Sequence, residues 1–339
     1  MSGRPAGAAR SFFVLVPILD DWPNATSIVE RLGEEFERNA WTGSVLIVDD
    51  GSSGSAPPLP RRPDRLENVE ILRLRRNLGH QRAICVGLCH LEQRALDLPV
   101  IVMDGDGQDL PSDLPSLARV FATVGDPGAV FAARAKRPEG GLFKVFYRCY
   151  QILHRLLTGR GIRVGNFSIL SPRAVGAVTS SPEAWSHYAA AVAQSRIPIA
   201  TVDIDRAKRL TGPPRMNFVS LVTHGLSAIS VYADIVSVRL LIAGALATLI
   251  GLVVVVTLWL KQMVDPGPID PATVWLLVIG AVVVVQINIG ALLAGFLIHH
   301  GRRTASVVPR RDFTLFVESV TPWSSVAQPT EGGSPSAFS

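Results

Sequence analysis

Three carboxylates follow a short apolar run near the middle of the chain, in the sequence VIVMDGDGQDLP. Asp104, Asp106 and Asp109 fall within six positions directly after a run that predicts a buried strand. Carboxylates crowded at a strand end raise one another's pKa, and a divalent cation with oxygen ligands removes that repulsion. Gly105 and Gly107 permit the tight turn that lets two carboxylates reach one cation. Taken alone, the motif also fits an acidic solvated turn or a helix capped by Asp109.

Acidic residues also follow two other predicted strands. An apolar run at 11–18 precedes Asp20-Asp21, and a run at 44–48 precedes Asp49-Asp50. Further strand-like runs alternate with helical patterns, the strands at 69–74, 98–103 and 129–133 and the helices at 24–38 and 80–95. This alternation predicts an α/β fold with a mainly parallel sheet and helices on both faces. Because ligands of such folds bind at the carboxyl ends of the strands, we expect the acidic residues to line one binding edge.

Two uncharged apolar segments, 240–260 and 274–298, lie in the C-terminal part of the chain. Each is long enough to cross a hydrocarbon core of about 30 Å at about 1.5 Å per residue, so we predict two transmembrane helices. Arginines flank the outer ends of the pair, and the connecting loop holds one Lys and two Asp. The positive-inside rule then places the soluble part in the cytoplasm, on a multi-pass protein of the inner (plasma) membrane.

These patterns divide the chain into five parts. They are a flexible N-terminus (1–11), an α/β domain (12–214), interfacial amphipathic helices (215–237), two transmembrane helices (238–300) and a cytoplasmic, partly disordered tail (301–339). The net charge of +5 does not come with a basic helix interleaved with aromatics, so we expect no nucleic-acid partner. An anionic lipid bilayer is the partner that fits a basic, membrane-tethered chain.

Three motifs in order, VDDGSS, RNLGHQRAICVGL and VIVMDGDGQDLP, resemble glycosyltransferase family 2 in its GT-A fold. The resemblance covers residues 12–240 and is to the polyprenyl-phosphate glycosyltransferases, such as dolichol-phosphate mannose synthase and the bactoprenol glucosyl transferases. The two C-terminal apolar segments match the bacterial branch of that type.

The resemblance implies roles for individual residues. Asp104, Asp106 and Gln108 would hold Mg²⁺ or Mn²⁺ against a nucleotide diphosphate, which makes Asp106 a catalytic residue. The nucleotide, UDP- or GDP-linked, would be bound by Pro17, Asp20, Asp21, Asp50 and Arg209. Such a cation bridges two phosphates and stabilises the charge of the leaving diphosphate, and an arginine adds a charge-assisted contact.

Residue 166 departs from the family pattern. The family's Gly-Asp-Phe-Arg reads Gly165-Asn166-Phe167-Ser168 here, and Asn cannot act as the general base proposed for that Asp. A lipid monophosphate needs no such base, because its second pKa of about 6 leaves the oxygen ionised at neutral pH. We therefore expect Asn166 to orient an acceptor phosphate by donating a hydrogen bond. A further departure, PILDD at 17–21 in place of the family's aromatic-containing motif, concerns the nucleotide base.

A basic segment interleaved with aromatics spans 134–148. Such a segment can lie at a membrane surface, with its cations toward phosphates. We expect Arg134, Arg137 and Arg148 to bind the acceptor phosphate, the alternative being a solvated basic loop. Within the second apolar segment, Gln286 and Asn288 are expected to face protein, either the first span or a second copy of the chain.

The sequence thus predicts a membrane-anchored, inverting glycosyltransferase that moves one sugar from a nucleotide sugar to a polyprenyl (undecaprenyl- or decaprenyl-type) phosphate. Two alternatives stay open. One is transfer to a glycan or lipid hydroxyl, for which a base at position 166 would matter. The other is a degenerate, non-catalytic nucleotide-binding membrane protein, supported by PILDD and Asn166 but opposed by the DGDGQD motif.

Overall fold

The computed structural model describes residues 11–94, 97–134, 148, 152–159, 164–204, 225–227, 229–265, 267–268, 270–303 and 307–324. These residues cluster into two compact units. The first contains the described residues up to 134 together with 164–204 and 307–324. The second contains residue 148, residues 152–159 and the described residues from 225 to 303.

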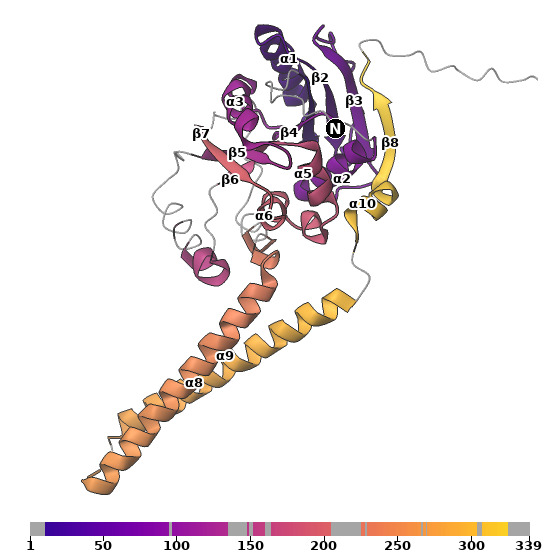
Figure 1. Ribbon diagram of the computed structural model, residues 1–339. Helices are drawn as coiled ribbons and strands as arrows, with labels where there is room; N and C mark the ends of the chain where they lie inside the picture. Colours follow the sequence, from indigo (N-terminus) through magenta and orange to yellow (C-terminus); the bar gives the residue numbers. More distant parts are fainter. Residues whose placement is uncertain are drawn as a thin grey trace, which may run out of the picture. The chain divides into compact units, whose positions relative to one another are not determined.

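The described part of the first unit is built on an eight-stranded mixed sheet with the order β7-β5-β6-β4-β1-β2-β3-β8 (Figure 1). The strands are β1 (Ser11–Ile18), β2 (Thr42–Asp49), β3 (Leu66–Leu74), β4 (Val100–Val102), β5 (Ala129–Arg134), β6 (Val164–Leu170), β7 (Ile199–Ile204) and β8 (Val317–Pro322). The pairs β1–β2, β1–β4, β2–β3 and β5–β7 are parallel, while β6 runs antiparallel to β4 and β5. The predicted α/β fold with a mainly parallel sheet is confirmed.

Helices cover both faces of this sheet. The helices α1 (Trp22–Arg38) and α3 (Leu114–Val124) pack on one face, and α2 (His80–Gln93), α5 (Pro172–Thr179) and α6 (Tyr188–Gln194) pack on the other. Alternate residues of β1 enter opposite cores: Val14 and Val16 pack with α1, whereas Leu15 packs with α2. Because both faces are buried, the strands carry continuous apolar runs rather than an alternating pattern. Short helical turns, η1 (Pro111–Asp113) and η2 (Pro182–Trp185), complete the loops.

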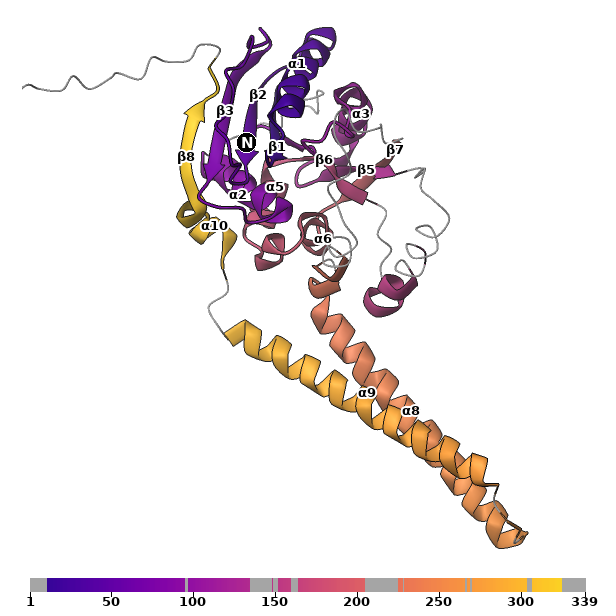
Figure 2. The ribbon, with the colours of Figure 1, turned by 180° about the vertical axis from the view of Figure 1, so that it is seen from behind.

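The chain beyond the apolar helices returns to the sheet. The segment forms α10 (Pro309–Asp312), η3 (Phe313–Phe316) and β8, which pairs antiparallel with β3 at the sheet edge (Figure 2). Trp323 is buried beside Trp22, with ring centroids 5.7 Å apart. Residues 309–324 of the predicted cytoplasmic, partly disordered tail (301–339) therefore pack on the sheet. The strand has few apolar residues and is held largely by main-chain pairing, so its pattern resembles that of a polar tail.

The second unit contains two long apolar helices that lie side by side in both views, α8 (Ala233–Val264) and α9 (Pro271–Arg303) (Figures 1 and 2). By length and composition, Ala233–Val264 and Pro271–Leu297 are able to cross a membrane, with mean hydropathies of 2.7 and 2.5. Asn288, predicted to face protein, donates from Nδ2 to Thr248 Oγ1 of α8 at 3.2 Å. Gln286 is exposed on α9.

Candidate functional site

The DGDGQD loop leaves β4 at the predicted sheet edge and lies against the end of β1. A Cβ added to Gly105 would stand 2.5 Å from the carbonyl oxygen of Pro17, so this close approach requires glycine. Within the loop, Asp106 Oδ1 accepts a hydrogen bond from the main-chain N–H of Gln108 at 3.1 Å. Asp109 Oδ2 accepts one from the N–H of Asp104 at 2.9 Å. The hydrogen bond of Asp109 thus closes the loop, and the loop fixes the main-chain positions of Asp104 and Asp106.

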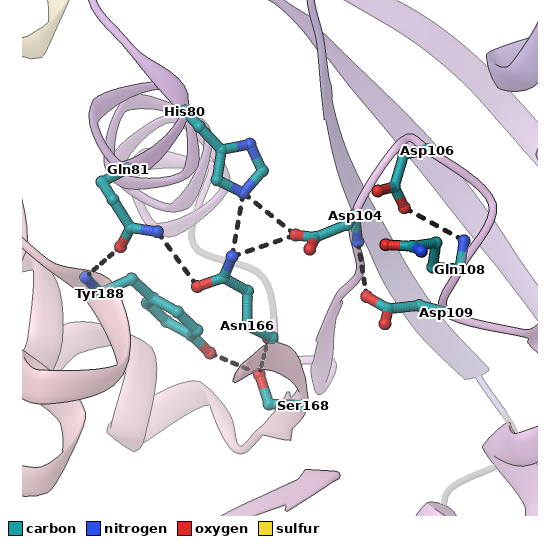
Figure 3. A network of polar contacts seen from close by, with 9 residues as sticks. All are labelled: His80, Gln81, Asp104, Asp106, Gln108, Asp109, Asn166, Ser168 and Tyr188. Atoms are coloured by element: carbon teal, nitrogen blue, oxygen red, sulfur yellow. Dashed lines mark hydrogen bonds and ion pairs between the residues drawn. The ribbon is translucent and has the colours of Figure 1, made fainter. Parts of the chain in front are cut away.

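Asp104 meets two side chains from other elements (Figure 3). Its Oδ1 atom lies 3.0 Å from Nε2 of His80, the first residue of α2, and accepts a hydrogen bond at 3.0 Å from Nδ2 of Asn166 in β6. His80 Nε2 and Asn166 Nδ2 are 2.9 Å apart. Asn166 is 9% exposed, and the Asp104 side chain is 14% exposed. The site is therefore a half-buried polar cluster formed by the loop after β4, the start of α2 and β6.

The electrostatics of this cluster are dominated by carboxylates. Burial disfavours the charged imidazolium of His80, but the negative charges of Asp104, Asp106 and Asp50 outweigh burial and raise the pKa of His80 above its ordinary value. A cation near His80 would instead lower the pKa of its imidazole. The cluster thus attracts positive charge, whether it comes from a proton or from a metal ion.

Asn166 is itself held by a chain of hydrogen bonds (Figure 3). Gln81 donates from Nε2 to Asn166 Oδ1 at 3.2 Å and accepts from the main-chain N–H of Tyr188 at 2.7 Å. Ser168 Oγ donates to the main-chain carbonyl of Asn166 at 2.8 Å and lies 2.6 Å from the Tyr188 hydroxyl. Tyr188 is 1% exposed, and burial raises the pKa of its hydroxyl far above the ordinary value. The sequence predicted Asn166 but gave no role to Gln81, Ser168 or Tyr188.

Asp50 connects the loop after β2 to the turn that precedes α2. Its buried carboxylate accepts hydrogen bonds from the main-chain N–H groups of Leu78 at 2.7 Å and Gly79 at 2.9 Å. Burial raises the pKa of Asp50, and these two hydrogen bonds oppose that shift. At Gly51, φ is +75° and an added Cβ would meet the main chain of Arg76 and Asn77 at 2.7 Å. The VDDGSS motif therefore packs directly on the turn that starts α2.

The loops after β1 and β2 are also bonded to each other. Ser52 Oγ accepts from the N–H of Asp20 at 2.8 Å, and Asp20 Oδ1 accepts from the N–H of Ser53 at 2.7 Å. Asp21 accepts a hydrogen bond from the side chain of Asn24 at 2.9 Å, at the start of α1. The predicted nucleotide residues Asp20, Asp21 and Asp50 thus lie at neighbouring strand ends, in one connected set of loops.

An arginine that the sequence analysis missed supports these loops. Arg73 of β3 donates from its guanidinium to the carbonyl of Ser52 at 2.9 Å and lies 3.5 Å from Asp49 Oδ2. Asp49 is fully buried, so Arg73 supplies its counter-charge. On its other side, Arg73 lies 3.3 Å from Glu318 of β8. The returning C-terminal segment therefore contacts the residue that holds the loop after β2.

The residues of the DGDGQD loop fit a divalent cation by their chemistry. Asp104, Asp106 and Gln108 offer hard oxygen donors, the ligands that Mg²⁺ and Mn²⁺ prefer. Among the described residues, no three His, Cys, Asp or Glu side chains form a self-contained metal centre. Mg²⁺ is commonly held by one or two carboxylates together with substrate phosphates, which two aspartates at an open edge allow.

The remaining predicted site residues are placed as follows. Pro17 is buried near the end of β1, opposite Val48 of β2. Arg134 is the last residue of β5, paired with Ile204, and Arg148 is exposed. Arg137 and Arg209 lie outside the described residues.

The Glycosyl transferase family 2 model matches residues 14–175. The chain is 23% identical over 228 residues to the uncharacterized glycosyltransferase YkcC of Bacillus subtilis, covering 66% of this chain and 68% of that protein. It is 25% identical over 155 residues to an undecaprenyl-phosphate 4-deoxy-4-formamido-L-arabinose transferase of Pectobacterium carotovorum, covering 45% of this chain and 46% of that protein. The match thus spans less than half the length of the latter relative.

Among solved structures, glucosyl-3-phosphoglycerate synthase of Mycobacterium tuberculosis, in complex with Mn²⁺ and UDP-glucose, is 16% identical with a TM-score of 0.47. That alignment covers 68% of this chain and 80% of the synthase. The family match spans the loops after β1, β2 and β4 as well as Asn166. Residues 14–175 are therefore a glycosyl transferase family 2 domain of GT-A fold, the type of domain that carries glycosyltransferase activity.

Proposed function

We propose that this chain transfers one sugar from a nucleotide sugar to a polyprenyl phosphate at a membrane surface. The observation that carries the proposal is that one chain joins a family 2 domain, with its DGDGQD loop directly after β4, to two helices apolar enough to cross a membrane. A lipid acceptor is the substrate for which such an anchor is useful. Relatives at 25–27% identity are named for transfer to undecaprenyl phosphate, which supports the same acceptor class.

The chemical step is a single displacement. An oxygen of the acceptor phosphate attacks the anomeric carbon, forming a new carbon–oxygen bond. The bond from that carbon to the nucleoside diphosphate breaks on the opposite face, so the configuration inverts and the diphosphate leaves with the electron pair. A Mg²⁺ or Mn²⁺ ion held by Asp104, Asp106 and Gln108 would supply charge stabilisation to that leaving group.

The acceptor phosphate needs no base near Asn166. Its second pKa of about 6 leaves the attacking oxygen ionised at neutral pH, so no proton has to be removed. A sugar hydroxyl would require general-base assistance, and an asparagine at position 166 does not provide it. This difference favours a phosphate over a hydroxyl as the acceptor.

The nucleotide would bind across the loops after β1 and β2, where Asp20, Asp21 and Asp50 lie, with Pro17 beneath them and Arg209 on a phosphate. The acceptor phosphate would be bound by Arg134, Arg137 and Arg148. The helices α8 and α9 would anchor the chain in the inner (plasma) membrane as a multi-pass protein, with the catalytic domain on the cytoplasmic side. A second copy of the chain is a further proposed partner, because the exposed Gln286 on α9 could hydrogen-bond to it within the membrane.

The decisive experiment is an acceptor assay on membranes that contain the full-length protein. A panel of radiolabelled UDP- and GDP-sugars is incubated with added undecaprenyl phosphate and divalent cation, and the lipid is extracted. We expect label from one donor in a mild-acid-labile lipid product, and none with Asp106→Asn. Label that appears only in a water-soluble glycan or in a lipid that is stable to mild acid would identify a hydroxyl acceptor instead and refute the proposal.

Arg134 tests the acceptor side separately. Loss of one charge-assisted contact to a phosphate costs about 1.5–3 kcal/mol, or about ten- to a hundredfold in the acceptor-dependent rate. Arg134→Ala should raise the KM for polyprenyl phosphate, or lower kcat, while nucleotide affinity by titration calorimetry stays unchanged. If nucleotide affinity falls and acceptor dependence is retained, Arg134 belongs to the donor site.

A further inference from the structure

The orientation of two side-chain amides in the site follows from one main-chain donor (Figure 3). The N–H of Tyr188 can only donate, and it donates to Gln81 Oε1 at 2.7 Å. The other end of the Gln81 amide is then the NH₂ group, which donates to Asn166 Oδ1 at 3.2 Å. The Asn166 NH₂ group must in turn face Asp104, whose Oδ1 accepts from it at 3.0 Å. The sequence of donors runs in one direction, from Tyr188 to the carboxylate of Asp104.

The same tyrosine also anchors the other side of Asn166. Its hydroxyl lies 2.6 Å from Ser168 Oγ, which donates to the main-chain carbonyl of Asn166 at 2.8 Å. Tyr188 is 1% exposed, and its ring lies beside Phe131, with centroids 5.9 Å apart. Gln81, Asn166, Ser168 and Tyr188 therefore form a closed ring of hydrogen bonds, fixed to the core at Tyr188.

This arrangement gives Asn166 a partner other than the acceptor. The Asn166 amide donates a hydrogen to Asp104 and so stabilises the ionised carboxylate. Because the amide is neutral, it does not repel a cation bound by that carboxylate. An aspartate at this position could still accept the hydrogen bond from Gln81, but it has no hydrogen to donate to Asp104 and would place a like charge beside it. The asparagine matches the direction in which Gln81 donates.

We propose that Gln81 is a positioning residue for the metal-binding carboxylate: it fixes the Asn166 amide so that this amide holds Asp104 in the orientation that binds the divalent cation. The proposal rests on the proposed function, in which Asp104 is a metal ligand. Partners that orient a metal ligand typically change metal affinity by about 10- to 100-fold when they are removed. Gln81 needs no contact with either substrate to have this effect.

The test measures Mn²⁺ binding directly, by electron paramagnetic resonance on the full-length protein in detergent at pH 8, alone and with UDP or GDP. Gln81→Glu keeps the acceptor for Tyr188 but removes the donor to Asn166, and Gln81→Met removes both. We expect either variant to weaken Mn²⁺ binding about tenfold or more, with an unchanged melting temperature. The matched control is Gln93→Glu, at the exposed end of the same helix, which should bind Mn²⁺ like the unaltered protein.

A double-mutant cycle separates positioning from a general structural role. If Gln81 acts through Asn166, then Gln81→Glu should have no further effect on Mn²⁺ affinity in an Asn166→Ala background. Additive losses, or a Gln81→Glu variant that binds Mn²⁺ as well as Gln93→Glu does, overturn the proposal. The proposed function fails in a different way: the unaltered protein and Asp104→Asn would then show the same Mn²⁺ binding, and Asp104 would not be a ligand that any residue positions.

Discussion

Asn166 Nδ2 lies 3.0 Å from Asp104 Oδ1, although the two residues are 62 positions apart in the chain. The antiparallel pairing of β6 with β4, in which Ser168 is opposite Val102, brings them together. Residue 166, at which the sequence resemblance implies a general base, therefore contacts the DGDGQD loop in this chain. Its side chain acts on the carboxylate that we propose binds the metal ion.

Asn166→Asp is expected to weaken metal binding rather than to restore a base. The new carboxylate would replace the hydrogen-bond donor that orients Asp104 by a like charge that repels it. We expect the Mn²⁺ concentration for half-maximal activity to rise about tenfold, an order expected for a group that orients a ligand, with a smaller change in rate at saturating metal. Asn68→Asp, at an exposed position of β3, is the control. A rate gain above about a hundredfold would show instead that a missing base limits this enzyme.

Asp106→Asn should abolish turnover and leave folding nearly unchanged. Asp106 lies in a loop where its carboxylate accepts a hydrogen bond from the Gln108 N–H, and an amide oxygen can accept the same bond. Loss of its negative charge would weaken its hold on the divalent cation that we propose it binds. The measurements are activity and thermal unfolding, with Asp97→Asn, exposed just before β4, as the matched variant. Full activity of the unaltered protein in excess EDTA would contradict the metal requirement.

Arg73→Gln should raise the KM for the nucleotide sugar and lower the melting temperature. The guanidinium holds the Ser52 carbonyl and faces the buried carboxylate of Asp49, so its loss leaves a buried charge unpaired. Arg73→Lys keeps the charge but not the planar guanidinium. Its KM and melting temperature should lie between those of Arg73→Gln and those of the unaltered protein. Arg61→Gln, which breaks an exposed pair with Asp64, should change neither quantity. An unchanged KM for the nucleotide sugar together with a raised KM for the acceptor would show that Arg73 does not support the nucleotide site.

Sequence patterns predicted the parts of this fold that local chemistry determines. The strands β1 to β5 are apolar runs because both faces of the sheet are buried. The motifs that follow β2 and β4 led to the prediction of Asp50, Asp104 and Asp106 as site residues. The strands β6, β7 and β8 were missed, because none of them is a continuous apolar run. Asn166 and Ser168 interrupt β6, and β7 and β8 are edge strands with alternating or mostly exposed residues. The role of Gln81 could not be predicted, since its partner Tyr188 is 107 positions away and a hydrogen-bond direction leaves no pattern in the sequence.

His90 should make the first unit sensitive to acid. Burial lowers the pKa of His90, Arg94 lowers it further by repulsion, and Glu70 partly opposes this. Its Nε2 atom has no hydrogen-bond partner in the part of the chain that the structure describes. The folded state therefore binds this proton less readily than the unfolded state, whose His pKa is about 6.5. The stability involved is present above that pH and is lost as the pH falls below it toward the folded-state pKa.

His90→Gln cannot titrate in this range. Its melting temperature should therefore fall less than that of the unaltered protein between pH 8 and a pH below about 6. Groups common to both proteins cancel in the comparison. Equal acid sensitivity of the two proteins would show that His90 is solvated well enough to be protonated in the folded state.

Trp323 should be essential to the stability of the first unit, because β8 and its flanking residues are part of the sheet. Its ring is 5% exposed and packs edge-on to Trp22, and its Nε1 donates to the carbonyl of Pro57 at 2.7 Å. Trp323→Ala creates a cavity and is expected to cost about 3–5 kcal/mol, whereas Trp323→Phe keeps an aromatic ring and loses mainly the hydrogen bond, about 0.5–1.5 kcal/mol. Thermal or denaturant unfolding of the detergent-solubilised chain measures both, and Trp275→Ala, on the exposed surface of α9, serves as the control. If Trp323→Ala unfolds together with the unaltered protein, the C-terminal strand is not part of the cooperative unit that holds the loops after β1 and β2.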